Sequence, residues 1–472
     1  MEPPDRTTAR VVAWRGRATR AEIDLDALAG NVAAIRTVLP ADTGVMAVVK
    51  ANAYGHGAVE IARAAVEAGA VGLAVATVGE GQSLRRAGIV APALVLGAID
   101  PTEAEAALRS LLAVTVGTEE LLDAVQAAAR RIGLARPVLV HVKVDTGLRR
   151  YGALPDLALA LARRVDADAR LDLDGVFTHF ATADEDDDCF VDDQRRLLSQ
   201  CLARLAEAGI RPRHSHQANS AGALRGVAAG TSLARVGIAL YGASPSPAVP
   251  LAAGIRPVMT LRSRIARVFD LAPGDTVGYG RTYRSTTTER AALVPLGYGD
   301  GYRRVLSGRG WMGIGGRRAA AIGRVSMDQT VVRLAAGVGA AVGDEVTVMG
   351  GSSDEAGPAA DELAALCDTI PYELFTGIAV RVPRLFLRGG EVVSFDDGAG
   401  PSDRPELDSE SGGYGIRLET LPWRRGPLPQ PLLLGDPERE GGEHDGRRSP
   451  ADQPSPRGTR ATPSKPTRRR RA

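Results

Sequence analysis

The chain has 472 residues, of which 44% are hydrophobic and 24% charged, as in an ordinary globular protein long enough for two folded domains. A net charge of +2 indicates no strongly acidic or basic partner, and three scattered cysteines, Cys189, Cys201 and Cys367, exclude a disulfide framework or a cysteine zinc site. No run approaches the roughly 20 apolar residues of a membrane span, and residues 1–20 lack the apolar core of a signal peptide, so we expect a cytoplasmic protein that binds neither membranes nor nucleic acids.

Residues 21–250 alternate between short apolar runs and amphipathic helical patterns. The helical patterns, with apolar residues at i, i+3 and i+4, include 58–68, 119–131 and 193–208. About eight units of this kind over roughly 220 residues predict a (β/α)8 barrel. An open, doubly wound sheet is the competing fold, but no glycine-rich dinucleotide fingerprint follows the first strand. The expected strands are 45–50, 72–77, 93–96, 113–116, 138–144, 175–179, 214–219 and 235–241.

After residue 250 the pattern changes to strand-like runs separated by Gly/Asp turns. We therefore predict a mostly β domain over 251–388, which follows a barrel domain at 21–250 and an N-terminal tail at 1–20. Residues 389–472 are rich in Pro, Gly and Arg with little apolar material, so we expect a largely disordered tail. The expected strands of the β domain include 258–269, 291–295, 319–325 and 345–349.

Lysine is rare in this chain. Of the 58 basic residues only three are lysines, and one of these, Lys465, lies in the Pro/Arg-rich tail. The other two, Lys50 and Lys143, close apolar strand runs, where catalytic residues lie in barrels. Only an ε-amine condenses with an aldehyde or takes up CO2 as a carbamate, so the scarcity favours covalent chemistry over an ordinary strand-end charge.

Residues 50–57, Lys-Ala-Asn-Ala-Tyr-Gly-His-Gly, resemble a motif of alanine racemase, the barrel-plus-β-domain family of pyridoxal phosphate enzymes. The resemblance runs from about residue 21 to residue 387, and the motifs recur in the family's order. It implies a homodimer with active sites shared between chains. It also implies that the enzyme interconverts L-alanine and D-alanine with pyridoxal 5'-phosphate and supplies D-alanine for peptidoglycan.

The resemblance also implies which residues hold the cofactor. Lys50 bonds to it covalently and acts as base on one face of the substrate α-carbon. Arg235 faces the pyridine nitrogen and is oriented by His179. Because an arginine stays protonated, the ring nitrogen accepts a hydrogen bond and carries no proton, which favours racemisation over transamination. The phosphate contacts carry over to Tyr54, Asn219, Ser220, Gly237 and Ile238, and barrels often bind phosphate on the loops after their last two strands.

Racemisation needs an acid/base on each face of the α-carbon. In the family the second base is a tyrosine from the neighbouring subunit, and it matches Tyr279, which we prefer over Tyr283. The substrate contacts match Arg150, Tyr298, which lines the route into the site, and the backbone of Met327. The lysine matching Lys143 is often carbamylated and positions the arginine matching Arg150.

Two positions depart from the family pattern. Arg149 stands where the family usually has glycine, which leaves the choice between Arg149 and Arg150 open. Val380 stands where the family commonly carries a phosphate-binding tyrosine, so the phosphate contacts rest on Tyr54 and the barrel loops. We predict no metal site, because the acidic run 184–188 lacks ligand spacing and His214 with His216 supply only two ligands.

Two alternative functions stay open. A non-enzymatic barrel that binds pyridoxal phosphate would share Lys50 and the phosphate loops, but it needs neither a β domain nor Tyr279. An amino-acid decarboxylase, or a racemase for a larger side chain, would use the same architecture. The choice of alanine rests on the resemblance.

Overall fold

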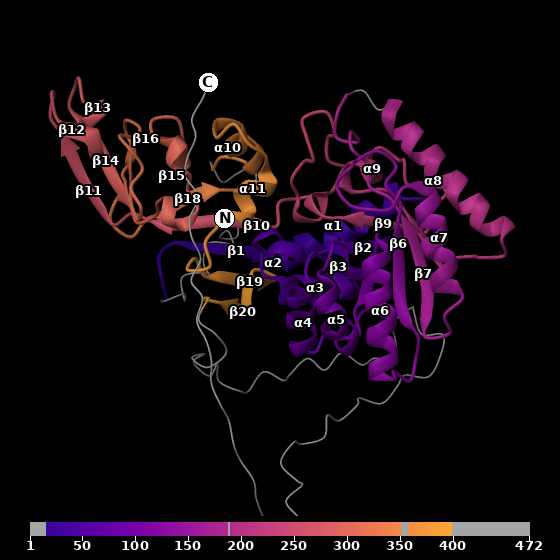
Figure 1. Cartoon of the computed structure of the whole chain (residues 1–472). Helices are drawn as coiled ribbons and strands as arrows, with labels where there is room; N and C mark the ends of the chain where they lie inside the picture. The colour runs from indigo at the N-terminus through magenta and orange to yellow at the C-terminus, as the bar shows by residue number, and fades with distance from the viewer. Residues whose placement is uncertain (1–15, 187–188, 351–356, 399–472) are drawn as a thin grey trace, which may run out of the picture. The chain divides into compact units, whose positions relative to one another are not determined.

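The computed structural model describes residues 16–186, 189–350 and 357–398, and all of them belong to one compact unit, Met1–Ser411 (Figure 1). Most of the predicted tail at 389–472 therefore lies outside the described residues. Residues Glu391–Asp396 are an exception, since they form strand β20 and pair with β19 (Arg384–Arg388). The ordered chain thus continues past the predicted boundary at residue 388.

Eight parallel strands close into a barrel in chain order, which confirms the predicted barrel over an open sheet. The last strand pairs with the first, with Arg235 opposite Met46. Near-continuous Val, Leu and Ala runs suit strands that are covered on both faces. The barrel strands are β2 (Gly44–Val48), β3 (Gly72–Val75), β4 (Ala93–Val95), β5 (Ala113–Val116), β6 (Val138–Lys143), β7 (Leu171–Phe177), β8 (His214–His216) and β9 (Leu233–Val236).

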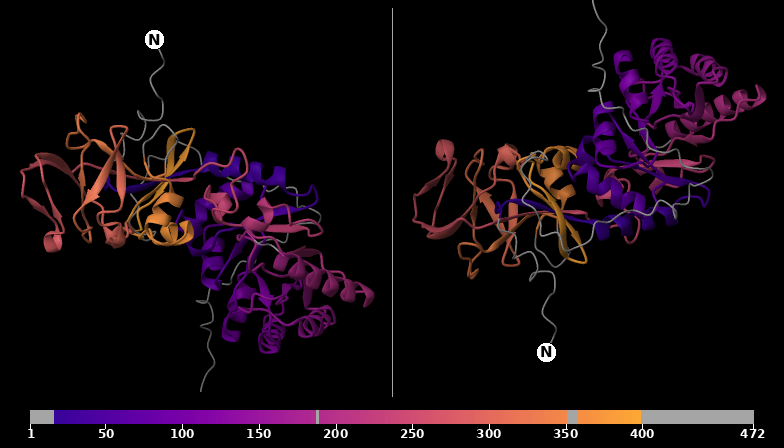
Figure 2. Two further views of the ribbon diagram at one scale, coloured as in Figure 1. Left: turned by 90° about the horizontal axis from the view of Figure 1, so that it is seen from above. Right: turned by 90° about the horizontal axis from the view of Figure 1, so that it is seen from below.

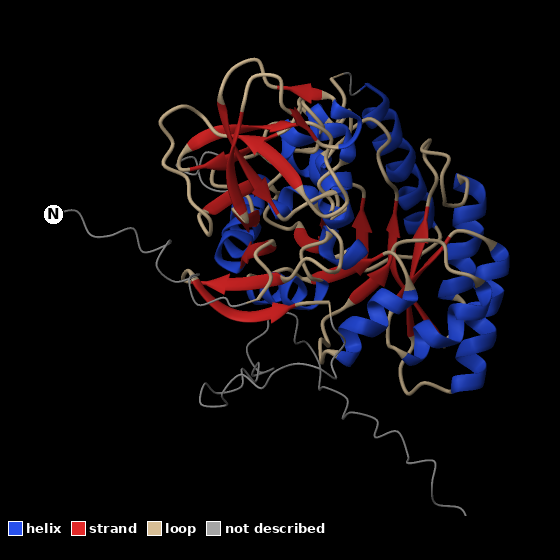
Figure 3. Cartoon of the chain, turned by 90° about the vertical axis from the view of Figure 1, so that its left-hand side faces the viewer, coloured by secondary structure: helices blue, strands red, loops and turns tan. Residues whose placement is uncertain are grey.

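Helices lie outside these strands (Figure 3). Helix α6 (Glu119–Ile132) shows how these helices begin and end. The Thr118 side chain caps its start by accepting from the Leu121 N–H, and the helix ends at Gly133, whose φ is 62°. Its apolar stripe packs on the barrel, as expected for an amphipathic helix. The other outer helices are α1 (Leu25–Val38), α3 (Ala58–Glu67), α4 (Val78–Arg86), α5 (Ala104–Arg109), α7 (Pro155–Asp166) and α8 (Cys189–Glu207).

The second half of the chain forms a ten-stranded sheet with two short helices, α10 (Ala360–Leu366) and α11 (Pro371–Thr376). A two-stranded ribbon, β12 (Thr276–Val277) and β13 (Tyr283–Arg284), projects from it. This agrees with the predicted mostly β region. The sheet strands are β10 (Met259–Arg264), β11 (Arg267–Leu271), β14 (Glu289–Val294), β15 (Trp311–Ile314), β16 (Arg317–Ile322), β17 (Thr330–Arg333), β18 (Glu345–Met349), β19, β20 and β1 (Arg20–Asp24).

Strand β1 departs from the predicted division of the chain at residue 250, because it lies in this sheet between β10 and β19 (Figures 1 and 2). Its buried Arg20 and Glu22 complete an ion cluster. Arg20 Nη2 lies 2.7 Å from Glu345 Oε2, and Arg262 Nε lies 2.7 Å from Glu22 Oε2. Separate folding of 21–250 and 251–388 stays a prediction. Within the described ranges, no helix combines the length and apolar content of a membrane span.

Candidate active site

Lys50 lies two residues after the end of β2, at the start of the short helix α2 (Lys50–Tyr54). The four residues that follow it, Ala51, Asn52, Ala53 and Tyr54, all have φ between 51° and 53°. This is the left-handed region, which costs a non-glycine residue roughly 1–2 kcal/mol. A run of four such residues persists only where the surrounding structure holds it, and such strain gathers at functional sites.

Hydrogen bonds hold this left-handed turn from several sides. The Glu80 carboxylate accepts from the Ala51 N–H over 2.7 Å, and Arg384 Nε donates to the Gly55 carbonyl over 3.0 Å. Nδ1 of the buried His56 donates to the Tyr54 carbonyl over 2.9 Å. The turn therefore depends on both halves of the chain, and it sets where the side chains of Lys50 and Tyr54 emerge.

Lys50 belongs to a cluster of four cationic side chains. The other three are Lys143, Arg150 and Arg235. Burial lowers the pKa of Lys50, and the charges of Arg150 and Arg235 lower it further, while Glu80 opposes them. Burial together with Arg235 and Arg150 lowers the pKa of Lys143 to about 8. In the part of the chain that the structure describes, none of the four forms an ion pair. Such an excess of positive charge fits an anionic ligand.

Arg235, predicted to face the cofactor ring, is buried on β9 and held by neighbouring barrel strands. Its Nη2 donates to the Thr178 carbonyl over 2.8 Å and to Nδ1 of His179 over 3.1 Å, while Nη1 donates to Nδ1 of His216 over 2.8 Å. Burial lowers the pKa of Arg235 to about 9, which still leaves it charged at neutral pH. Burial and the Arg235 charge keep the pKa of His179 well below 6.5, so this imidazole is neutral and accepts.

The two predicted phosphate loops meet beside Tyr54. Asn219 caps the short helix α9 (Ser220–Leu224) by accepting from the Gly222 N–H over 2.9 Å, and Ser220 Oγ accepts from the Gly237 N–H over 3.0 Å. A Cβ added at Gly237 would lie 2.5 Å from the Tyr54 hydroxyl oxygen. That hydroxyl makes no hydrogen bond to any described residue. The neighbouring Ile238 is fully buried.

These features can be compared with the groups of a ligand that carries both an aromatic ring and a phosphate ester. Glycine 237 leaves room where any side chain would fill the space, and Tyr54 supplies a free hydroxyl at the same place. The cations supply charge for a phosphate and a phenolate, and Arg235 supplies a donor for a ring nitrogen. The residues present therefore fit pyridoxal phosphate.

A second tyrosine lies beside Tyr54, although our sequence analysis did not find it. The ring of Tyr372, on α11, has its centroid 5.8 Å from that of Tyr54. Val380, by contrast, is 67% exposed. That the phosphate contacts rest on Tyr54 and the barrel loops stays a prediction, and Tyr372, eight positions before Val380, stands next to Tyr54. The only available signal was a tyrosine in the first turn of a short helix.

The structure distinguishes the two neighbouring arginines. Arg149 has φ 56°, a backbone conformation that suits glycine, which explains why glycine is usual there in the resembling family. The charge of Arg150 acts on Lys50, Lys143 and His179. Arg149 is not among the charges that act on these groups, so the electrostatics favour Arg150.

Three predicted residues are not brought to Lys50 within one chain: Tyr279, Tyr298 and Met327. They are exposed by 73%, 41% and 53%, and no described hydrogen bond or ring contact links them to the Lys50 group. Gly299 N donates to the Met327 carbonyl over 2.8 Å, so the segments of Tyr298 and Met327 lie side by side. We call Tyr279, Tyr298 and Met327 the exposed patch. Tyr283 differs, because its hydroxyl donates to Glu289.

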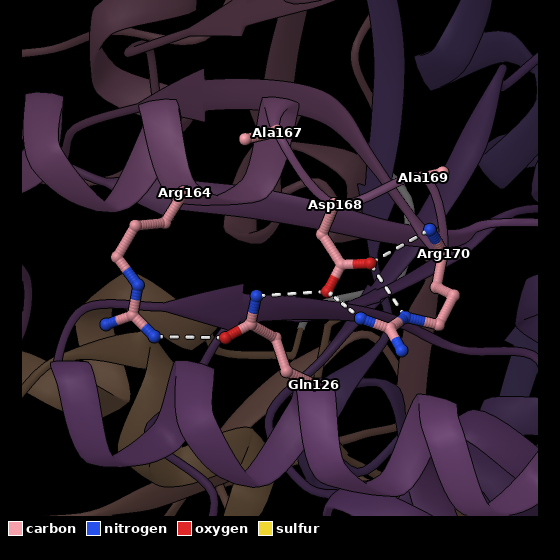
Figure 4. A pocket seen from close by; sticks show the side chains of 6 residues that line it. All are labelled: Gln126, Arg164, Ala167, Asp168, Ala169 and Arg170. Carbon is pink, nitrogen blue, oxygen red and sulfur yellow. Dashed lines mark hydrogen bonds and ion pairs between the residues drawn. The ribbon is translucent and has the colours of Figure 1, made fainter.

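One surface pocket of about 580 Å³ lies elsewhere, between α6 and α7 (Figure 4). Its polar side chains satisfy one another: Gln126 Nε2 donates to Asp168 over 3.0 Å, and Arg170 Nε does so over 2.7 Å. The pocket precedes β7 at the amino ends of the barrel strands. Lys50 and Lys143 lie at the carboxyl ends, so the pocket takes no part in the candidate site.

Comparison with known proteins agrees with this arrangement. The family model "Alanine racemase, N-terminal domain" matches residues 23–245, and "Alanine racemase, C-terminal domain" matches 258–386. The chain is 44% identical over 377 residues to an alanine racemase of Symbiobacterium thermophilum, which covers 80% of this chain and 98% of that protein. Over 387 residues it is 39% identical to that of Geobacillus stearothermophilus, covering 81% and 97%.

Solved structures give the same picture. Alanine racemase of Bacillus anthracis with bound L-Ala-P superposes with a TM-score of 0.74 at 38% identity, covering 82% of this chain and 99% of that one. Alanine racemase of Clostridium difficile 630 gives a TM-score of 0.77 at 34% identity, covering 82% and 100%.

Proposed function

Because the chain belongs to the alanine racemase family, we propose that it interconverts L-alanine and D-alanine with pyridoxal phosphate as cofactor. The reaction supplies D-alanine for peptidoglycan. The observation that carries the proposal is the cluster of Lys50 with three other cations, none of them in an ion pair among the described residues, next to the Tyr54 hydroxyl at the Gly237 loop.

The residues that would hold the cofactor follow from the site. Lys50 Nζ would bind it covalently. The Tyr54 hydroxyl, Ser220 and the backbone of Gly237 and Ile238 would hold its phosphate, with Asn219 shaping the loop and Tyr372 beside it. Arg235 donates from Nη1 and Nη2 to protein acceptors, and its Nε–H, which has no acceptor among the described residues, would face the ring nitrogen. When bound, pyridoxal phosphate supplies an electron-withdrawing ring that stabilises negative charge on the substrate α-carbon.

Proton transfer falls to two groups on opposite faces of that carbon. Burial and neighbouring cations lower the pKa of Lys50, which brings an amine closer to the range in which it accepts a proton at neutral pH. We propose Tyr279 as the second base. Arg150 would hold the substrate carboxylate together with the Met327 backbone, and Tyr298 would line the route into the site.

We propose a homodimer in which the exposed patch of each subunit completes the site of the other. One chain by itself places Lys50 and Tyr279 in separate regions, and one group cannot easily serve both faces of the α-carbon. Exposed Tyr279, Tyr298 and Met327 are also residues of the types that interfaces cover. A chain with only three cysteines has too few for a disulfide framework, which suits the reducing cytoplasm where we place the enzyme.

We further propose that Lys143 carries a carbamate. The buried Nζ lies 5.4 Å from the Tyr151 ring centroid and 5.6 Å from that of Phe177, with no carboxylate paired to it in the described structure. A pKa of about 8 leaves enough neutral amine to attack CO2, which forms an N–C bond and releases one proton. The resulting carboxylate would compensate the excess charge and position Arg150.

The experiment that tests the function couples L-alanine turnover to a D-amino-acid oxidase and then reduces the enzyme with borohydride. We expect D-alanine formation and a pyridoxyl mass on the peptide containing Lys50. Bound cofactor without turnover of any amino acid would favour a non-enzymatic binding protein. Release of CO2 would favour a decarboxylase, and preference for larger amino acids would favour a racemase of another specificity.

A further inference from the structure

A chain of hydrogen bonds leads away from Arg235 through the barrel interior. Nη1 of Arg235 lies 2.8 Å from Nδ1 of His216, and Nε2 of His216 lies 2.9 Å from Nδ1 of His141. Nε2 of His141 lies 3.0 Å from Oδ2 of Asp174, whose other oxygen accepts from Arg213. The contacts join strands β9, β8, β6 and β7. Neither His141 nor Asp174 has a part in the function proposed above.

The protonation of both imidazoles follows from the donor and acceptor rules. Arginine only donates, so Nδ1 of His216 accepts and carries no proton. A neutral imidazole has one N–H, which must then lie on Nε2 of His216 and point to His141. Nδ1 of His141 therefore accepts, and its proton lies on Nε2, where it donates to Asp174. Every hydrogen bond in the chain runs from the Arg235 cation toward the Asp174 anion.

Neighbouring residues of the barrel leave space for the two imidazole rings and pack against them. A Cβ at Gly175, on the strand beside His141, would clash with Nδ1 and Cε1 of the His141 ring. The pairing of β6 with β7 also shifts register at this position, between Val140 and His141. Phe177 stacks on His216 with centroids 4.4 Å apart and planes 11° apart. Both imidazoles are buried, so neither finds water as an alternative partner.

The charges at the two ends of the hydrogen-bond chain, on Asp174 and Arg235, agree with hydrogen bonds that run from Arg235 toward Asp174. Burial raises the pKa of Asp174, but the hydrogen bond from His141 and the charge of Arg213 outweigh it, so the net direction is downward. Burial and then the charge of Arg235 hold the pKa of His216 well below 6.5. An anion and a cation are thus joined through two neutral rings. In a low-dielectric interior, each hydrogen bond of such a series strengthens the next.

We propose that His141 and Asp174 are positioning residues for Arg235: the Asp174 carboxylate, acting through the two neutral imidazoles, holds the guanidinium in place against the cofactor ring. The proposal rests on the proposed function only for what Arg235 faces. The direction of the hydrogen bonds is a property of this chain by itself.

The first test measures the imidazole protons directly in the cofactor-loaded enzyme labelled with 15N-histidine. We expect three of the six histidines to show a proton on Nε2 and an unprotonated, accepting Nδ1: His141, His216 and also His179, which accepts from Arg235. The Nε2 proton of His216 should show nuclear Overhauser contacts to the rings of His141 and Phe177. A proton on Nδ1 of His216, or a cationic His141, overturns the proposal, and this test needs no variant.

The second test compares two carboxylates on the same strand. Arg213 pairs with both Asp172 and Asp174, but only Asp174 contacts His141. Asp174→Asn should shift the 15N signals of His141 and His216 and the absorption spectrum of the bound cofactor. We expect kcat to fall by about 10-fold, as when an outer partner of a metal ligand is lost, with KM for alanine unchanged.

The matched control, Asp172→Asn, should leave the two histidine signals, the spectrum and kcat as in the wild type. If Asp174→Asn and Asp172→Asn behave alike in all three, the chain has only a structural role and the proposal fails. Expected tautomers in a protein without racemase activity would refute the proposed function and leave the chain of hydrogen bonds intact. Normal racemase activity with other tautomers would support the proposed function and refute the chain of hydrogen bonds.

Discussion

The Glu80 carboxylate accepts a 2.7 Å hydrogen bond from the backbone N–H of Ala51, the residue that follows Lys50. Its second oxygen accepts from the Ala76 N–H over 2.7 Å and closes a capping box with Thr77 at the start of α4. One side chain therefore ties a helix start to the left-handed turn that carries Lys50. Its charge also opposes the fall in the Lys50 pKa.

Replacing Glu80 with alanine should loosen this turn and lower the pKa of Lys50 further, because an opposing negative charge is removed. We expect a loss of about 1–2 kcal/mol in unfolding free energy, as for other helix caps. The Lys50 pKa can be followed as the pH dependence of its acetylation in cofactor-free protein, by mass spectrometry. Glu103 closes a similar capping box with Asp100 far from Lys50, so Glu103→Ala should not move the Lys50 profile. Equal profiles in both variants would contradict this role of Glu80.

Arg149→Gly should stabilise the protein. Its φ of 56° costs a non-glycine residue roughly 1–2 kcal/mol, and the greater freedom of glycine in the unfolded chain offsets part of this gain. The net gain in unfolding free energy should be about 0.5–1 kcal/mol, measured by urea denaturation. At Arg136, an exposed loop arginine without positive φ, the same replacement should be neutral or destabilising. A destabilised Arg149→Gly protein would show that the side chain makes contacts worth more than the strain.

Mixing two inactive variants tests the shared site. Lys50→Ala lacks one base and Tyr279→Phe lacks the other, but a mixed dimer contains one site with both. Random re-association of equal amounts should restore about a quarter of the wild-type activity. Each variant refolded alone is the control. Absence of recovery, with mixed dimers demonstrated by mass, would refute a site built from two chains.

A carbamate on Lys143 predicts a 13C signal in protein equilibrated with labelled bicarbonate. The signal should grow as the pH rises through about 8, because only the neutral amine attacks CO2. Lys143→Arg keeps the positive charge but cannot form the carbamate, so the signal should vanish. Lys465→Arg changes the lysine of the tail and should keep it. A signal that survives Lys143→Arg would place the carbamate elsewhere.

The buried histidines predict loss of stability in acid. Burial lowers the pKa of His56 from 6.5 to about 4, against the opposing effect of its hydrogen bonds to Tyr54 and Ala53. Because the unfolded chain binds this proton first, stability is present above pH 6.5 and is lost as the pH falls toward 4. His56 accounts for about 3 kcal/mol of the unfolding free energy that is lost over this pH range. His56→Gln should flatten urea-derived unfolding free energy over this range, and the same change at half-buried His214 should flatten it less. An unchanged slope in His56→Gln would contradict the assignment.

Several features of the site were predictable because their cause is local. Apolar runs of four to seven residues alternating with helical patterns predicted a closed barrel, and the structure confirms it. Since parallel strands bring their carboxyl ends to one edge, Lys50 and Lys143 could be expected to lie together, and the charges of Arg235 and Arg150 act on both. The assignments of individual roles stay predictions.

Other features depend on contacts between distant segments. His216 was weighed only as a metal ligand, because its partner His141 lies 75 positions away and meets it only through barrel closure. Tyr372 reaches Tyr54 from a helix more than 300 residues later. The left-handed turn after Lys50 contains no glycine among residues 51–54, so the sequence does not predict it. Glu80 and Arg384 hold it in place.

The sequence by itself determined the order of strands and helices and the chemistry of the residues at the strand ends, because periodicity and residue type act within one element. Only the tertiary structure decided that β1 joins the C-terminal sheet, that two histidines link Arg235 to Asp174, and that Tyr279 stands exposed. Strand register, barrel closure and burial set those relations, and they arise only when segments far apart in the chain pack together.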